Sequence, residues 1–163
     1  MIVLVMGVEG SGKSTVGRAL AAAQGWVFAD GDDFHSAGNK KKLHLGIALT
    51  DEDRAPWLEA MHAAILRWHD LSTNVVLAAS ALRETYREQM FLGVPSSGYR
   101  IVYLEGSQQT LEDRLRTRVG HFASPEILSS QLATLEPPRN AITISISQTV
   151  EQQVDKIRAA LRG

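Results

Sequence analysis

The sequence predicts an α/β protein in which helices wrap a parallel β-sheet. Three observations support this prediction. A glycine-framed loop at 7–14, with the sequence GVEGSGKS, directly follows an apolar run at 2–6. Short apolar runs and longer amphipathic stretches then alternate along the chain, which is typical of parallel strands connected by helices. The length of 163 residues suits a single domain over 1–163.

Five apolar runs have the length of buried strands, and they lie at 2–6, 26–30, 74–79, 100–105 and 141–146. Apolar residues at helical spacing predict helices over about 53–70 and 149–162, and another helix begins near Lys13. Pro56 restricts the start of the 53–70 helix, because proline is tolerated only in the first helical turn. Asp53 is therefore the expected N-cap, and Thr50 is the alternative for an irregular earlier start.

The loop at 7–14 fits the pattern G-x-x-x-x-G-K-[ST], which binds the phosphates of a nucleoside triphosphate. Its glycines let the backbone N–H groups turn inward around an anion, and the following helix adds the positive end of its dipole. The Lys13 ammonium is expected to reach the β- and γ-phosphates, and the Ser14 hydroxyl to hold Mg²⁺. The predicted nucleotide-binding residues of this loop are Gly7, Val8, Glu9, Gly10, Ser11, Gly12, Lys13, Ser14 and Thr15.

Ligands of open α/β sheets bind at the carboxyl ends of the strands, so the residues after each strand are the candidates for chemistry. The second strand is followed by Asp30-Gly31-Asp32-Asp33-Phe34-His35. A carboxylate there can accept the proton of an acceptor hydroxyl or bind Mg²⁺ through water. Asp32 is the candidate base, Asp30 the candidate on the Mg²⁺ side, and His35 a candidate ligand for substrate oxygens. The alternative is an Asp-Gly turn whose acids only cap the next helix.

Basic residues near the same edge of the sheet are candidates for binding anions. Arg54 suits a carboxylate because its planar guanidinium can bind two oxygens, and an ion pair with a neighbouring acid is the alternative. Ser80 and Arg83 follow the third strand. Arg114 and Arg118 share one face of the helix after the fourth strand. They can stack on adenine and clamp phosphates, or they are idle cations at a helix C-terminus.

Composition narrows the range of partners. Seventeen basic and eighteen acidic residues give a net charge of −1, so no surface for nucleic acid or anionic lipid is expected. The sequence has no cysteine, which excludes disulfides and thiolate metal sites and fits a reducing compartment. The apolar N-terminal run lacks the basic start and the cleavage site of a signal peptide, and no later run is long enough to span a bilayer. A cytoplasmic protein with small-molecule partners is expected.

Taken together, these segments resemble gluconokinases, which are small P-loop sugar-acid kinases related in fold to shikimate and nucleoside monophosphate kinases. The resemblance covers nearly the whole chain and rests on several motifs besides the phosphate-binding loop. They are Asp30-Gly31-Asp32 with His35, Asn39 with Lys42, Gly46, Leu49-Thr50-Asp51-Glu52-Asp53-Arg54 before Pro56-Trp57-Leu58, Ser80-Ala81-Leu82-Arg83 with Tyr86-Arg87, Arg114, Arg118-Val119-Gly120-His121-Phe122, and Ser130-Gln131 with Leu135-Glu136-Pro137.

The resemblance implies ATP-dependent phosphorylation of D-gluconate at its 6-hydroxyl, which yields 6-phospho-D-gluconate and ADP. It also implies a three-layer P-loop kinase fold with five parallel strands in the order 2-3-1-4-5, a lid around 117–125, Mg²⁺ as cofactor and often a homodimer. With this resemblance, the candidate catalytic residues are Lys13, Asp32 and Arg118. The candidate substrate contacts are Asp32, His35, Lys42, Arg54, Ser80, Arg83 and His121.

Other nucleotide-dependent proteins are the alternatives. A kinase of another small acid such as shikimate, or of a nucleoside monophosphate, is the alternative enzyme. Against shikimate, the stretch 79–82 reads Ala-Ser-Ala-Leu in place of a glycine triplet. A GTPase-type switch is disfavoured because the chain has no Asn-Lys-x-Asp motif and no Asp-x-x-Gly aspartate at a strand end. An assembly ATPase is disfavoured because no acid ends the third strand as a Walker B residue would.

Overall fold

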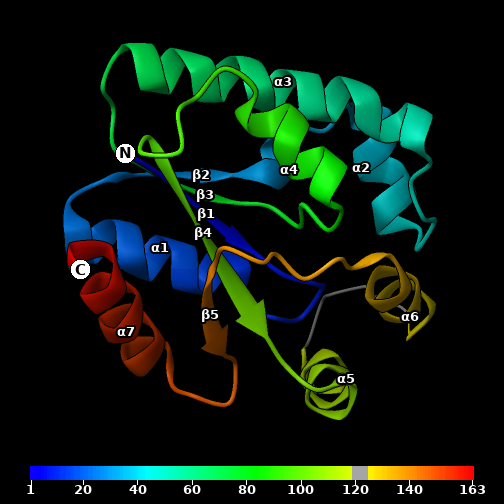
Figure 1. The fold of residues 1–163 in the computed structure, drawn as a ribbon. Coiled ribbons are helices and arrows are strands. Elements are labelled where there is room, and N and C mark those ends of the chain that lie inside the picture. The colour runs from blue at the N-terminus through cyan, green and yellow to red at the C-terminus, as the bar shows by residue number, and fades with distance from the viewer. Residues whose placement is uncertain (119–124) are drawn as a thin grey trace.

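The computed structural model describes residues 1–118 and 125–163. Its strands are β1 (Ile2–Met6), β2 (Val27–Asp30), β3 (Val75–Ala78), β4 (Tyr99–Glu105) and β5 (Ile142–Ser145). They form one parallel sheet in the order β2-β3-β1-β4-β5, so the order that the resemblance implies is confirmed (Figure 1). Each strand begins and ends within about one residue of its predicted position. Leu4 of the central strand pairs with Leu77 on one side and Ile101 on the other.

Helices cover both faces of the sheet, and the fold therefore has three layers (Figure 1). One face carries α1 (Lys13–Gln24) and α7 (Val150–Arg162), and the other carries α3 (Asp51–Asp70) and α4 (Glu84–Phe91). The central strand β1 is buried throughout, which explains its continuous apolar sequence. Val5 packs into the core with α1 and α7, whereas its neighbours Leu4 and Met6 pack into the core with α3 and α4.

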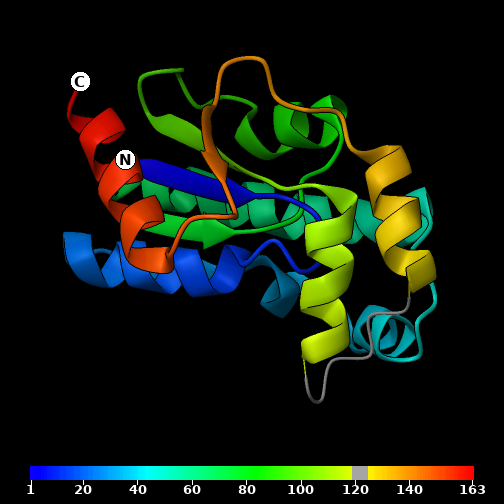
Figure 2. The same ribbon diagram turned by 90° about the horizontal axis from the view of Figure 1, so that it is seen from below.

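The remaining elements lie toward the carboxyl ends of the strands (Figure 2). They are the short 3₁₀ helix η1 (Gly31–Phe34) and the helices α2 (Ala37–His44), α5 (Gln108–Thr117) and α6 (Pro125–Thr134). The sequence analysis does not predict α2, because the basic run 40–42 hides any apolar periodicity. The Ser36 hydroxyl caps it by accepting the Asn39 N–H at 3.1 Å. The expected lid around 117–125 falls mostly in 119–124, outside the described residues.

The prediction that Asp53 caps the long helix is wrong, because α3 begins at Asp51 and Thr50 is its N-cap. The Thr50 hydroxyl accepts the Asp53 N–H at 3.1 Å, and the Asp53 carboxylate accepts the Thr50 N–H at 3.0 Å. This reciprocal pair forms a capping box, which stabilises the earlier start. Lys42 Nζ adds a contact at 2.9 Å to Asp53. Pro56 therefore lies inside the helix, where it removes one backbone hydrogen bond.

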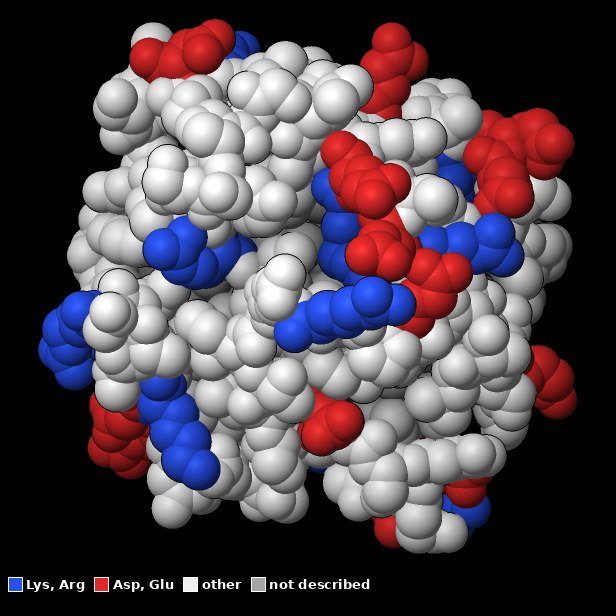
Figure 3. Space-filling view, in the orientation of Figure 1, with Lys and Arg blue, Asp and Glu red and all other residues white. Residues whose placement is uncertain are grey.

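The surface of the protein carries charged side chains of both signs (Figure 3). On the face shown in Figure 3, basic and acidic side chains lie interspersed. This mixture agrees with the formal net charge of −1. Of the helices in the described ranges, none combines the length and apolar character needed to cross a membrane.

Candidate active site

The loop between β1 and α1 presents backbone N–H groups at the carboxyl end of the central strand. Gly12 lies at the N-cap of α1 with a φ of 93°, a left-handed conformation that glycine adopts without steric strain. Within the described residues, no side chain caps this helix, so its first N–H groups are open to an anion. The Lys13 ammonium turns back over the loop and donates to the Val8 carbonyl at 3.1 Å. The loop and its lysine therefore surround a space suited to phosphate.

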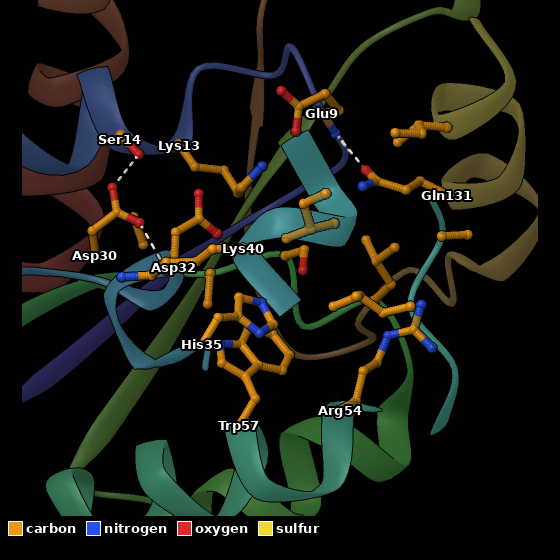
Figure 4. Close-up of a pocket in the computed structure, with 18 of the residues that line it drawn as sticks. Glu9, Lys13, Ser14, Asp30, Asp32, His35, Lys40, Arg54, Trp57 and Gln131 are labelled. Atoms are coloured by element: carbon orange, nitrogen blue, oxygen red, sulfur yellow. Dashed lines mark hydrogen bonds between the residues drawn. The ribbon is translucent and has the colours of Figure 1, made fainter. Parts of the chain in front are cut away.

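Ser14 and Asp30 meet at the foot of this loop. The Ser14 hydroxyl donates to Asp30 Oδ2 at 2.8 Å (Figure 4). The other carboxylate oxygen, Oδ1, accepts the Asp32 N–H at 3.0 Å and caps η1. The alternative of a helix-capping acid thus applies to Asp30. Because both of its oxygens already accept hydrogen bonds, Asp30 is less suited than Asp32 to take up a proton.

The Asp32 carboxylate projects into the same space as the Lys13 side chain (Figure 4). No residue in the described ranges donates a hydrogen bond to this carboxylate. Desolvation in the cavity raises the pKa of Asp32, the charge of Asp30 raises it further, and Lys13 opposes the shift. A raised pKa moves a carboxylate toward the range in which it works as a general base near neutral pH. Asp32 therefore has the free oxygens and the environment of a proton acceptor.

Some of the charges around Lys13 raise the pKa of its ammonium, and one lowers it. Burial lowers the pKa of Lys13. The carboxylates of Glu9, Asp32 and Asp30 oppose this shift, whereas the guanidinium of Arg118 adds to it. Arg118 thus lies close enough to Lys13 for the two cations to repel each other. A bound triphosphate would relieve that repulsion, because its negative charge is shared between them.

His35 follows η1 and stacks on Trp57 of α3, with ring centroids 4.5 Å apart and an interplanar angle of 6°. The side-chain nitrogen of Asn39 lies 2.7 Å from the Asp53 carbonyl oxygen and 3.4 Å from His35 Nδ1. Since an amide nitrogen only donates, Nδ1 is the acceptor and the proton of the neutral ring is on Nε2. Nε2–H is then a donor for an oxygen of a ligand.

His35 makes stability depend on pH in a defined direction. Burial lowers its pKa to about 4, and the charges of Arg54 and Lys40 act in the same direction. The unfolded chain binds this proton near pH 6.5 and the folded chain only near pH 4, so acid in this window favours unfolding. As the pH rises from about 4 to 6.5, we expect His35 to raise the free energy of unfolding by at most about 3 kcal/mol.

Urea unfolding at several pH values measures this contribution, which we expect to be absent from His35→Gln. NMR titration of the His35 ring reports its pKa directly. A ring that titrates near 6.5, the ordinary value, would contradict the expectation.

Arg54 lies in α3 with its guanidinium directed toward the cavity (Figure 4). Its Nη1 lies 3.5 Å from Asp51 Oδ1 and 3.5 Å from the Tyr86 hydroxyl, which itself donates to Asp51 at 2.8 Å. The alternative of an ion pair with a neighbouring acid is thus present. It is a weak pair, because the Asp51 side chain is 66% exposed and water screens the charges. A carboxylate inside the cavity can therefore compete for this guanidinium.

One cavity of about 630 Å³ gathers most of the predicted site residues. Its walls include Lys13, Ser14, Asp30, Asp32, His35 and Arg54. They also include Glu9, Gly10, Gly12, Ser80 and Arg118. In the described structure, Lys42 and Arg83 are not among these walls. Lys42 is paired with Asp53 as above, Arg83 Cζ lies 5.8 Å from the centre of the Tyr86 ring, and His121 is outside the described residues.

A second cavity of about 420 Å³ borders the same loop. Its walls include Gly10, Ser11, Gly12, Thr15, Arg114 and Arg118. The Arg114 guanidinium donates to the Ile146 carbonyl, which holds it against the end of β5. Gln148 and Gln153 also line this cavity, and their side-chain oxygens are buried without a hydrogen-bond partner in the described structure. Unused acceptors beside a guanidinium suit the amino group and the ring of a base such as adenine.

The chain is similar in sequence to known proteins over nearly its whole length. A family model described as an AAA domain matches residues 2–138. A probable gluconokinase of Mus musculus is 42% identical over 179 residues, covering 99% of this chain and 97% of its own. The gluconokinase of Gluconobacter oxydans (strain 621H) is 44% identical over 135 residues, covering 83% of this chain and 75% of its own. The chain belongs to the gluconokinase family.

Solved structures agree with this membership of the gluconokinase family. A gluconokinase from Sinorhizobium meliloti 1021 superposes with a TM-score of 0.87 at 39% identity, covering 98% of this chain and 90% of its own. A sugar kinase from Janibacter sp. HTCC2649 reaches a TM-score of 0.90 at 37% identity, covering 99% and 94%. Shikimate kinase from Aquifex aeolicus has a TM-score of 0.57 at 18% identity, which shows a shared fold alone.

Lys40, Trp57 and Gln131 line the cavity of this gluconokinase-family chain but are not among the predicted site residues. Trp57 belongs to a series of apolar residues at helical spacing, and this pattern predicts that it lies in the core. In the structure its Nε1 also donates to the Gly31 carbonyl at 2.7 Å. Lys40 belongs to a basic run of the kind that usually faces solvent. Gln131 contacts Glu9 from far along the chain, and only its place in a family motif marks it.

Proposed function

We propose that this chain transfers the γ-phosphoryl group of ATP to the 6-hydroxyl of D-gluconate, giving 6-phospho-D-gluconate and ADP. The observation that carries the proposal is a single cavity with a phosphate-binding loop at one end and a guanidinium at the other. Lys13 and Ser14 can hold a phosphate donor while Arg54 holds the carboxylate of the acceptor. Near full-length similarity to proteins named gluconokinases supports gluconate as that acceptor.

The donor end supplies charge neutralisation, which is the main requirement of phosphoryl transfer. The loop N–H groups and Lys13 bind the phosphate oxygens, and Arg118 borders both cavities, where it can clamp the phosphates. Arg114 lies beside the second cavity, where the adenine ring fits. In this arrangement the adenine of ATP and the gluconate lie on opposite sides of the transferred phosphoryl group.

The transfer itself needs one proton acceptor. The 6-hydroxyl oxygen of gluconate forms a bond to the γ-phosphorus while the bond from that phosphorus to the bridging oxygen breaks. The electron pair of the broken bond leaves with ADP, whose charge is stabilised by the loop N–H groups and Lys13. The Asp32 carboxylate accepts the hydroxyl proton, and the neutral His35 donates from Nε2 to a gluconate oxygen and orients the chain of hydroxyls.

Mg²⁺ is part of this proposal, and the residues present fit it. The Ser14 hydroxyl and the Asp30 carboxylate are hard oxygen donors that lie 2.8 Å apart beside the loop. Ser14 would contact the ion directly, and Asp30 would do so through water. Bound Mg²⁺ neutralises phosphate charge. Among the described residues, no cluster of three or more histidine, cysteine or acidic side chains forms a separate metal site, so phosphate oxygens would complete the coordination.

Arg54→Lys is expected to raise KM for gluconate about tenfold and to leave KM for ATP nearly unchanged. The reason is that an ammonium cannot bind two carboxylate oxygens in the planar geometry of a guanidinium. Initial rates at varied concentrations of each substrate measure both constants. Arg67→Lys makes the same change at an exposed position of α3 and serves as the control. An equal loss for both substrates would point to a structural role for Arg54.

ADP release by the purified protein tests the proposed function. D-gluconate, shikimate, other aldonates and nucleoside monophosphates are offered separately with ATP and Mg²⁺, and one reaction has no acceptor. We expect strong turnover with D-gluconate and a product phosphorylated at the 6-hydroxyl by ³¹P and ¹³C NMR. Turnover with a different acceptor alone would replace the substrate, and ADP release without an acceptor would replace the kinase with an ATPase.

Two further parts of the proposal concern the location and the assembly of the protein. The protein is expected to act in the cytoplasm, where its co-substrate ATP is available. It is also expected to form a homodimer, which light scattering of the purified chain tests at several concentrations.

A further inference from the structure

Gln131 of α6 reaches the phosphate-binding loop from 122 residues further along the chain. Its side-chain Oε1 accepts the backbone N–H of Glu9 at 2.6 Å (Figure 4). The side chain is partly buried and lines the larger cavity. This hydrogen bond connects α6 to the loop at a residue that precedes Lys13 by only four positions.

The peptide unit between Val8 and Glu9 is held on both of its polar sides. Its N–H donates to Gln131, and its carbonyl oxygen accepts the Lys13 ammonium at 3.1 Å and the Ser11 N–H at 3.2 Å. Because a peptide unit is planar and trans, its N–H and C=O point in opposite directions and turn together. A rotation that takes the N–H away from Gln131 therefore also moves the carbonyl on which Lys13 rests.

The helix that carries Gln131, α6, is held by hydrogen bonds just beyond its C-terminal end. The Glu136 N–H donates to the Leu82 carbonyl at 2.8 Å, and Glu136 Oε2 accepts the Glu84 N–H at 2.7 Å. Arg87 is only 6% exposed and donates to the carbonyls of Leu82 at 3.1 Å and Glu136 at 3.0 Å. The connection between β3 and α4 thus holds α6 in place, and α6 presents Gln131 to the loop.

We propose that Gln131 is a positioning residue, which holds the Val8–Glu9 peptide in the orientation that directs Lys13 toward the donor phosphates. The inference rests on the proposed function, because it needs a nucleotide in the loop. Without the Gln131 oxygen, the Glu9 N–H loses its partner and the peptide can adopt other orientations. The nucleotide must then order the loop when it binds, and this weakens its affinity.

Three variants test this role. Gln131→Met removes the acceptor oxygen at similar length and helix propensity, and Gln131→Glu keeps an acceptor at the same place. Gln89→Met makes the same chemical change at an exposed position of α4 and serves as the matched control. Gln131→Ala is the second way to remove the oxygen if the methionine variant does not fold. Thermal unfolding and circular dichroism verify the fold of each.

The first readout is nucleotide binding without any acceptor, by calorimetry with ADP and with a non-hydrolysable ATP analogue. We expect Gln131→Met to weaken binding about tenfold and Gln89→Met to leave it unchanged. The second readout is the backbone amide signal of Glu9 by NMR. In Gln131→Met we expect its proton to shift upfield and to exchange faster, whereas in Gln131→Glu the hydrogen-bonded position is retained. A residue that only packs α6 would not move this signal selectively.

Two results would overturn the inference. One is unchanged nucleotide affinity and an unchanged Glu9 amide in Gln131→Met. The other is a raised KM for gluconate with no change for ATP, which would make Gln131 a contact of the acceptor. Failure of the proposed function looks different, because wild-type protein would then bind nucleotide without turning over gluconate, while the Glu9 amide and the affinity would still respond to Gln131.

Discussion

Lys13→Ala is expected to lower kcat by about 10²–10⁴-fold with the fold intact, as measured by ADP release at saturating ATP and gluconate. The Lys13 ammonium is held within the loop on the Val8 carbonyl, next to the carboxylate of Asp32. Alanine removes the cation that neutralises charge on the transferred phosphoryl group. The contact to Val8 is the one polar contact of this ammonium in the described structure, so the loss of stability is expected to be small.

Lys156→Ala is the control for this experiment, because it removes the same charge from an exposed position of α7. We expect it to retain wild-type kcat. Circular dichroism and the thermal unfolding midpoint establish that both variants are folded. Near-full activity of Lys13→Ala would remove this lysine from the mechanism.

Asp32→Asn is expected to lower kcat by about 10²–10⁴-fold, with only a small change in KM for gluconate. An amide has nearly the shape of the carboxylate but cannot take up the hydroxyl proton. The raised pKa of Asp32 and its lack of hydrogen-bond donors among the described residues are the reasons for choosing it as the base. Steady-state kinetics over both substrates separate kcat from KM.

Asp30→Asn is the informative comparison, because the two carboxylates lie in the same segment but have different contacts. Asp30 accepts hydrogen bonds from Ser14 and from the Asp32 N–H, so its loss is expected to raise the Mg²⁺ concentration needed for activity. Asp155→Asn, at an exposed position of α7, controls for the loss of one charge. If Asp32→Asn changes only KM, or if Asp30→Asn lowers kcat more than Asp32→Asn does, then Asp30 is the base and Asp32 lies on the Mg²⁺ side.

The features that the sequence predicts correctly depend on local chemistry. The five strands are short apolar runs, of which β1 and β3 are buried throughout, and each strand lies at its predicted place. The loop at 7–14 needs glycine where its φ angles are positive, as at Gly10 and Gly12. The placement of Asp32 and His35 follows from the rule that ligands bind at the carboxyl ends of parallel strands, whereas Arg54 reaches the same cavity from the start of α3.

The start of α3 and the partner of Lys42 could not be predicted in the same way. A capping box and an ion pair with Lys42 stabilise a helix start at Asp51, with Pro56 in the helix interior. The general preference for proline in a first turn is a weaker effect than these combined contacts. Lys42 is a candidate substrate contact by resemblance, but in the structure its ammonium donates to both oxygens of Asp53 at 2.9 Å.

The sequence by itself determined the class of fold, the phosphate-binding loop and the candidate acid–base residues, because each is encoded in neighbouring residues by spacing, glycine content and charge. Only the tertiary structure decided which of the two acids has a carboxylate without a hydrogen-bond donor among the described residues, that Trp57 stacks on a neutral His35, and that Gln131 holds the Glu9 N–H. These features depend on distances between segments far apart in the chain. Such distances are set by how the helices pack across the sheet, and no local pattern of residues records them.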